Sequence, residues 1–169
     1  MTAVAHPKLA LRPFLPADAS MLAAIFRASI EELTTEDYSE AQQQAWVAKT
    51  AADENAFAAR LGQRLTLVAT LGGSAVGFIS LEGAEQIDLL YVHPAVAREG
   101  IGTMLYEAVE KLAASRGATR LTVEASDTAR DFFAKRGFVA QRRNTVLCGE
   151  EWLANTTMEK KLPTKRSAS

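Results

Sequence analysis

The sequence has few of the residues that build disulfides and metal sites. Its 169 residues include one cysteine, Cys148, and two histidines, His6 and His93. A single cysteine excludes an internal disulfide and a thiolate metal cluster, and two histidines argue against a zinc enzyme. We therefore expect a protein without a bound metal.

A strong charge imbalance and a long apolar segment are also missing. The 19 basic and 20 acidic side chains leave a formal net charge of −1, so no general positive field favours nucleic acid or an anionic membrane. No window approaches the roughly 18 uninterrupted apolar residues of a membrane-spanning helix. We expect a soluble, cytoplasmic protein that binds neither nucleic acid nor membranes.

What is present indicates one globular domain. Hydrophobic residues make up 48% of the chain and charged residues 23%, and single cores commonly extend over roughly 100–200 residues. Residues 1–162 are expected to form this domain, with residues 1–7 as a loose lead-in and residues 163–169 as a disordered tail.

The apolar pattern predicts an α+β fold. The strand-like runs at 65–70, 75–81 and 86–92, with turn signals between them, are typical of an antiparallel meander. Helices are expected after caps at Asp18 and Ser39. The other expected elements are an Ala-rich helical segment at 50–61, helices at about 102–115 and 127–135, and strands at 8–14, 120–124, 138–141 and 155–160, the last paired with part of 143–148.

The segment LLYVHPAVAREGIGTML, residues 89–105, carries the clearest chemical signal. A buried strand is expected to end at Val92, and Gly100-x-Gly102 then opens a helix. The N–H groups of such a loop and the positive end of the helix dipole suit a phosphate or pyrophosphate, although a tight turn also uses such glycines. Walker and dinucleotide motifs are excluded, because no Gly-Lys pair occurs and Leu105 occupies the third-glycine position.

A wider pattern resembles a known family. The run I-D-x-L-Y-V-H-P…R-x-G-I-G-x-x-L, followed by LTVEAS and ARDFFAKRGF, is similar to the GCN5-related N-acetyltransferase (GNAT) superfamily, in particular to bacterial members of unassigned substrate. The resemblance extends over roughly residues 65–162. It implies a mixed, mostly antiparallel sheet of about seven strands with helices on both faces, in which the parallel fourth and fifth strands splay apart.

The resemblance implies acetyl-CoA as co-substrate. The family motif Q/R-x-x-G-x-G/A matches at the loop, with Ala97 in place of its first residue. Main-chain N–H groups make most of the pyrophosphate contacts in the family, so this departure should weaken affinity only modestly. The fourth strand's edge would pair with the pantetheine arm. The expected cofactor contacts are Leu90, Tyr91, Val92, Arg98, Gly100, Ile101, Gly102, Thr103, Ser126 and Phe133.

A carboxylate base is expected because amide formation needs a neutral amine. Asp88 lies in the apolar run QIDLLYV, and a strand period of two places it on one face with Leu90 and Val92. Members of the resembled family often carry a catalytic carboxylate on that strand and face. Burial without a positive partner would make Asp88 a better proton acceptor. Alternatively, Asp88 bonds a backbone group or an arginine, and the fallback bases are Glu82, Glu85 and Glu124.

The usual acid of the family is missing. Many members protonate the CoA thiolate from the Tyr of a block N-x-x-A-x-x-F-Y-x-K-x-G-F, where this chain has Phe133, and where Ser126 replaces the Asn. We expect solvent to protonate the thiolate, with Tyr91 or Tyr106 as alternative donors. His93 is interpreted as a turn residue.

The first two helices cover the acceptor pocket in the resembled family. Aromatic residues, together with Glu31 and Glu32, suit a small cationic amine there, unless the apolar ones are simply core. The expected acceptor contacts are Phe26, Ser29, Ile30, Tyr38 and Trp46.

The implied function is acetyl-CoA-dependent acetylation of a primary amine of a small molecule or protein. Transfer would be direct in a ternary complex, and the protein would be a monomer or homodimer. The departures at Ala97 and Phe133 keep one alternative open, namely a weak or inactive acyl-CoA-binding sensor or interaction module.

Overall fold

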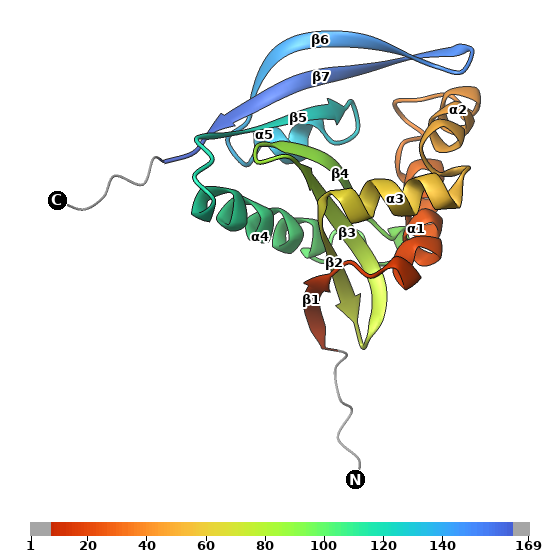
Figure 1. Cartoon of the computed structure of the whole chain (residues 1–169). Helices are drawn as coiled ribbons and strands as arrows, with labels where there is room; N and C mark the ends of the chain where they lie inside the picture. The colour runs from red at the N-terminus through yellow and green to blue at the C-terminus, as the bar shows by residue number, and fades with distance from the viewer. Residues whose placement is uncertain (1–7, 164–169) are drawn as a thin grey trace, which may run out of the picture.

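Seven strands form one mixed sheet in the order β1-β2-β3-β4-β5-β7-β6 (Figure 1). The computed structural model describes residues 8–163, so the expected lead-in at 1–7 and all but Pro163 of the expected tail lie outside the described residues. The strands are β1 (Leu9–Pro13), β2 (Leu65–Leu71), β3 (Ser74–Glu82), β4 (Gln86–Val92), β5 (Arg120–Ser126), β6 (Val139–Cys148) and β7 (Glu151–Lys161).

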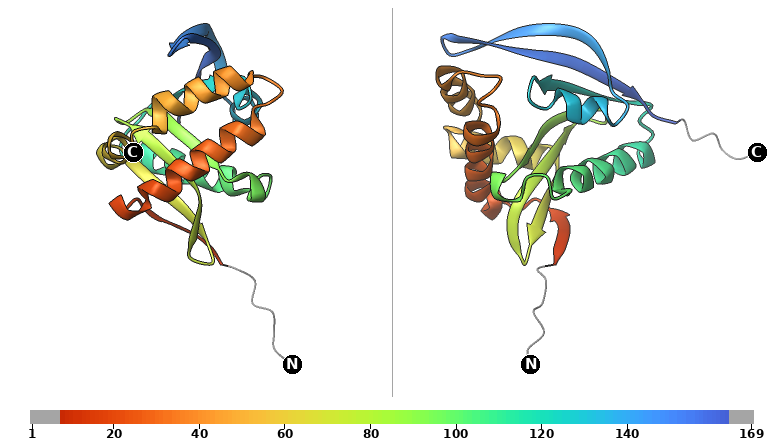
Figure 2. Two further views of the ribbon diagram at one scale, coloured as in Figure 1. Left: turned by 90° about the vertical axis from the view of Figure 1, so that its right-hand side faces the viewer. Right: turned by 180° about the vertical axis from the view of Figure 1, so that it is seen from behind.

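Helices cover both faces of this sheet, as expected for the fold class (Figure 2). On one side, α1 (Ala19–Leu33) and α3 (Glu54–Gln63) pack on β2–β4, and α2 (Glu40–Ala51) packs against α1, α3 and β7. On the other side lie α4 (Ile101–Ser115) and the short α5 (Arg130–Ala134). None of the described helices combines the length and the apolar character that a bilayer crossing requires.

Several element boundaries differ from the sequence-based expectation. The expected strands at 138–141 and 143–148 are one strand, β6, and α5 occupies only part of 127–135. The Ser39 hydroxyl caps α2 as expected, accepting from the Gln42 N–H at 3.1 Å. Asp18 occupies the expected N-cap position of α1, but its side chain makes no capping hydrogen bond. Its carboxylate instead binds Arg12 through two contacts of 2.7 Å, which lowers the pKa of Asp18.

The parallel strands β4 and β5 part after a very short contact. They pair only at Gln86 with Thr122 and at Ile87 with Val123. Beyond these two pairs, residues 88–92 of β4 have no partner on that side, although β3 continues to pair on the other. The expected splay of the fourth and fifth strands is therefore confirmed.

A β-bulge at Asp88 interrupts the alternation of side chains along β4. After the bulge, each side chain lies on the opposite face from the one that regular alternation predicts. Ile87 and Leu89 pair with adjacent residues of β3, so Asp88 is an extra residue between them. Leu90 and Val92 pack on the α4 side with Ile87, whereas Leu89 packs on the α1 side. Asp88 bonds to α3, also on the α1 side. The prediction that Asp88 shares a face with Leu90 and Val92 is wrong, because the bulge interrupts the two-residue period.

Candidate active site

One cavity of about 600 Å³ lies between the parted strands and the start of α4. This volume is within the range of small-molecule sites, roughly 300–1,000 Å³. The structure brings together around it all ten residues expected to contact the cofactor, namely Leu90, Tyr91, Val92, Arg98, Gly100, Ile101, Gly102, Thr103, Ser126 and Phe133.

The loop before α4 has the geometry of an anion site. Gly100, the N-cap of α4, has φ = 82°, and Arg98 also has a positive φ of 69°. The first backbone hydrogen bond of the helix joins the Met104 N–H to the Gly100 carbonyl. The preceding N–H groups in the first turn therefore have no intrahelical partner and can bind phosphate oxygens. The loop thus fits the pyrophosphate of a CoA molecule.

Two basic residues of the site were missed in the sequence. Lys135 and Arg136 line the cavity near the loop. The Arg136 guanidinium lies 3.5 Å from the Phe132 ring centroid and donates hydrogen bonds to the Phe132 carbonyl and to the Thr103 hydroxyl. The adjacent charges of the KR pair, directly after the apolar run FFA, were the signal that could have revealed them. Together with Arg98, they make this end of the cavity positive.

The expected acceptor residues separate into two groups. Ser29 and Trp46 line the cavity. Phe26 and Ile30 do not, because both side chains are fully buried in the core between α1 and the sheet. Tyr38 is also buried outside the cavity, against the β6–β7 hairpin. These three residues therefore lie outside the cavity wall, and their role in acceptor binding stays a prediction.

Two other residues of the same region line the cavity instead. Leu33 and Thr34 lie at the C-terminal end of α1, where Leu33 is one helical turn beyond Ser29. Residues four apart share a helix face, so the position of Ser29 could have pointed to Leu33. The exposed carboxylates Glu31 and Glu32 are not part of the cavity wall.

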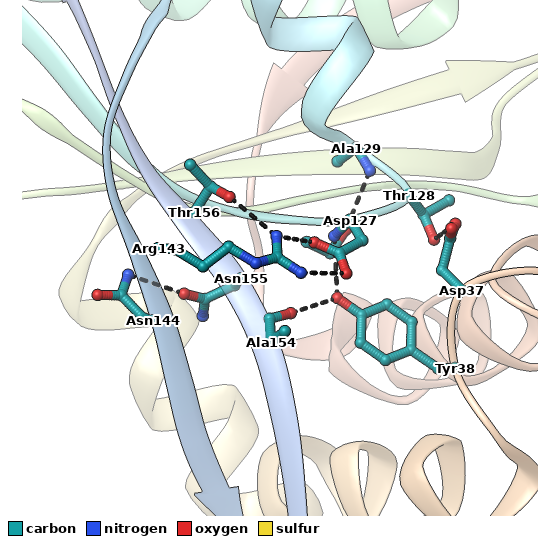
Figure 3. A network of polar contacts seen from close by, with 11 residues as sticks. Asp37, Tyr38, Asp127, Thr128, Ala129, Arg143, Asn144, Ala154, Asn155 and Thr156 are labelled. Carbon is teal, nitrogen blue, oxygen red and sulfur yellow. Dashed lines mark hydrogen bonds and ion pairs between the residues drawn. The ribbon is translucent and has the colours of Figure 1, made fainter.

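Tyr38 joins three segments behind the cavity (Figure 3). Its hydroxyl accepts from the Asp127 N–H at 2.9 Å and donates to the Ala154 carbonyl at 2.6 Å. Arg143 holds the Asp127 carboxylate through two contacts of 2.6 and 3.0 Å. Burial raises the pKa of Tyr38, which keeps the hydroxyl protonated and able to donate. The α1–α2 loop, the β5–α5 turn and β7 are therefore fixed relative to one another.

Tyr38→Phe should lower the free energy of unfolding by about 1–3 kcal/mol, because it removes both hydrogen bonds and leaves two backbone groups without this partner. Urea unfolding monitored by circular dichroism measures the change. Trp152→Phe, which alters an exposed ring of the same hairpin, serves as control. An unchanged midpoint for Tyr38→Phe would show that water replaces the hydroxyl without cost.

Asp88 forms a compact ion-pair cluster with α3. Its carboxylate accepts from Arg60 at 2.7 and 2.9 Å and from Arg64 at 3.2 Å, and its side chain is only 8% exposed. The hydrogen bond with Asp88 raises the pKa of Arg60. Asp88 does not line the cavity. Burial without a positive partner, the condition for its expected basicity, is therefore not met, and its role as general base stays a prediction.

The residue at the usual acid position and the two alternative proton donors occupy different places. Phe133 is buried, with its ring centroid 5.2 Å from those of both Phe132 and Phe138. Tyr91 lines the cavity, whereas Tyr106 is buried beneath it in the α4 core. Burial raises the pKa of Tyr91, so its phenol stays neutral.

His93 is a turn residue, as interpreted from the sequence. Its Nδ1 atom accepts a hydrogen bond from the Ala95 N–H at 3.0 Å. This contact caps the short 3₁₀ turn Pro94–Val96, which leads from β4 into the glycine loop.

Comparisons with known proteins agree with this geometry. The family model for the acetyltransferase (GNAT) domain matches residues 34–162. The chain is 32% identical over 151 residues to a protein of Escherichia coli K12 named "Uncharacterized N-acetyltransferase YafP", covering 89% of this chain and 95% of the relative.

Similar solved structures also include members of the GNAT family. A GCN5-related N-acetyltransferase from Rhodopseudomonas palustris is 58% identical, with a TM-score of 0.89, over 95% of this chain and 100% of the other. The PaiA N-acetyltransferase from Thermoplasma acidophilum, solved with coenzyme A, is 20% identical, with a TM-score of 0.77, over 92% of this chain and 99% of the other. The second likeness is one of fold alone.

Proposed function

Because this chain belongs to the GNAT family and is an N-acetyltransferase, we propose that it transfers acetyl from acetyl-CoA directly to a primary amine of a small molecule or protein. The main support for this proposal is that one cavity includes both the glycine loop and the wall formed by α1 and α2. Donor and acceptor can therefore meet in a ternary complex. Cys148, the last residue of β6, is buried in a small cluster with Tyr38 and Leu153, outside this cavity, which argues against transfer through its thiol.

In this proposal, the protein mainly binds and orients the two substrates. The free N–H groups at the start of α4 hold the pyrophosphate, and the positive charges of Arg98, Lys135 and Arg136 strengthen that contact. The unpaired edge of β4 at Leu90–Val92 is available to the amides of the pantetheine arm. Acetyl-CoA, when bound, supplies an activated acetyl group as a thioester.

Incubating the purified protein with acetyl-CoA and a panel of amines tests this function. Release of free CoA thiol and a product mass increased by one acetyl group are expected with at least one amine. Calorimetry measures CoA binding in parallel. Binding without thiol release across the panel would favour the acyl-CoA-binding module instead.

Phe133→Tyr should change the turnover little if solvent protonates the departing thiolate, whose pKa as a thiol is about 8.5. The comparison requires that the variant fold normally, because the new hydroxyl enters a buried aromatic cluster. Steady-state rates at saturating substrate measure the effect. A gain of about tenfold, equal to about 1.4 kcal/mol in the barrier, would show that a missing proton donor limits the reaction.

A further inference from the structure

Resting on the proposed function, we propose that the acceptor is a weakly basic aromatic amine, one that is uncharged at neutral pH. The inference comes from the acceptor side of the cavity, formed by the end of α1, α2, β4 and the β5–α5 turn. We call this side the acceptor wall, and its residues are Ser29, Leu33, Thr34, Trp46, Tyr91 and Thr128.

The acceptor wall carries two aromatic rings in addition to its hydroxyl groups. Trp46 and Tyr91 meet edge to face, with ring centroids 6.5 Å apart. The Thr34 hydroxyl is already engaged, because it donates to the Ile30 carbonyl at 2.6 Å and accepts from Gln43 at 2.9 Å. The two rings therefore suit an aromatic acceptor, which gains from edge-to-face or stacked contacts.

The charges around the cavity disfavour a cationic acceptor. Within residues 8–163, every charged side chain that lines the cavity is basic, namely Arg98, Lys135 and Arg136. These three side chains lie at the pyrophosphate end of the cavity. An alkylammonium ion would lose hydration on entering the cavity, and none of the described lining residues is a carboxylate that could replace it.

Three carboxylates of the surrounding elements already have partners. Asp88 binds Arg60 and Arg64, and Asp127 binds Arg143. Asp37 accepts from the Thr128 hydroxyl at 2.7 Å (Figure 3). These three carboxylates are therefore committed to structural contacts, and the exposed Glu31 and Glu32 lie outside the cavity wall.

The chemistry of an aromatic amine fits this environment. An alkylamine resembles the lysine amine, with a pKa of about 10.4, and at neutral pH it must lose a proton before it can react. An aromatic amine already carries a free lone pair. Its nitrogen attacks the thioester carbonyl carbon, and the N–C bond forms as the C–S bond breaks. The electron pair leaves with sulfur, the nitrogen loses its extra proton to water, and solvent returns one to sulfur. No side-chain base is required.

Two isomeric probes test this inference. 4-Methylaniline and benzylamine have the same formula and a similar size, but only benzylamine is protonated near neutrality. At about pH 7 we expect kcat/KM to be at least about tenfold higher for 4-methylaniline, and the difference to shrink as the pH approaches about 10. Higher values for benzylamine or spermidine at about pH 7 would overturn the inference but leave the proposed function intact. Failure of every amine to release CoA would overturn both.

Variants of the acceptor wall provide a second test. Ser29→Asp places a carboxylate on the wall and should shift the preference toward benzylamine at least about fivefold, whereas the isosteric Ser29→Asn should not. Trp46→Leu should lower kcat/KM for 4-methylaniline, and Trp152→Leu, at an exposed position of β7, should leave it unchanged. Equal effects of Asp and Asn at position 29 would contradict the inference, and if Ser29→Asp fails to fold, the comparison of isomers decides alone.

Discussion

Gly102→Asp is expected to weaken CoA binding at least about 100-fold, or about 2.7 kcal/mol, while the fold is retained. A Cβ at this position would lie 3.4 Å from the nearest atom of the Phe132 ring, an ordinary contact. An acidic residue in the first turn of a helix is also favourable for the helix itself. The carboxylate would, however, occupy the positive end of α4 and repel a pyrophosphate.

Calorimetry with CoA measures this effect, and thermal unfolding verifies the fold. Gly102→Asn is the matched control, because it adds nearly the same volume without charge. It should weaken binding by much less than Gly102→Asp. An Asp variant that folds and binds CoA as tightly as the unmodified protein would exclude the loop as the pyrophosphate site.

Asp88→Asn should lower the free energy of unfolding by about 2 kcal/mol. The substitution removes the charge that faces Arg60 and Arg64 and leaves one oxygen to accept their hydrogen bonds. Breaking a fully buried pair costs about 3–5 kcal/mol, but Arg60 is 35% exposed, so solvent reduces the loss. Denaturant unfolding measures it. Combining Asp88→Asn with Arg60→Gln should cost less than the sum of the single changes, as expected for residues in contact.

The same variant distinguishes two roles of Asp88. If the carboxylate only holds α3 against the bulge, turnover of every accepted amine, including those that must lose a proton, should stay within a few-fold of the unmodified rate, with CoA affinity nearly unchanged. A general base would instead lose about 10²–10⁴-fold in turnover. The acidic limb of the pH–rate profile would also disappear in that case. Rates are to be compared at a temperature where both proteins are folded.

The cofactor side of the site could be predicted because its signals are local in sequence. Gly100 and Gly102 mark the start of a helix that follows a buried strand. The strand and the two glycines together determine where an anion can bind. The parting of β4 and β5 came from the family resemblance, since apolar runs do not report how many residue pairs two strands form. Arg136 was missed because its contact with Thr103 joins positions far apart in the chain.

Two features could not be predicted, namely which residues of β4 share a face and which residues form the acceptor wall. Both depend on how elements pack against one another. Hydrophobic periodicity assumes regular pairing, and the bulge at Asp88 depends on the register with β3, which the sequence of one strand does not specify. Along α1, periodicity identifies an apolar face, but it does not separate Phe26, which is core, from Leu33, which reaches the cavity. The partners of Asp88, Arg60 and Arg64, lie on α3 and at its C-cap, more than twenty residues away.

The short contact between β4 and β5 should also determine how CoA binding changes amide hydrogen exchange and the unfolding of the sheet. Two residue pairs join a four-stranded half of the sheet to a three-stranded half, so amide hydrogens on the open edges should exchange with solvent faster than those inside either half. A pantetheine arm lying between these edges would bridge them as an additional strand does, but only while CoA is bound. Its arrival should slow that exchange and make the two halves unfold together. At a CoA concentration of about 100 times Kd, the added stability is about 2.7 kcal/mol.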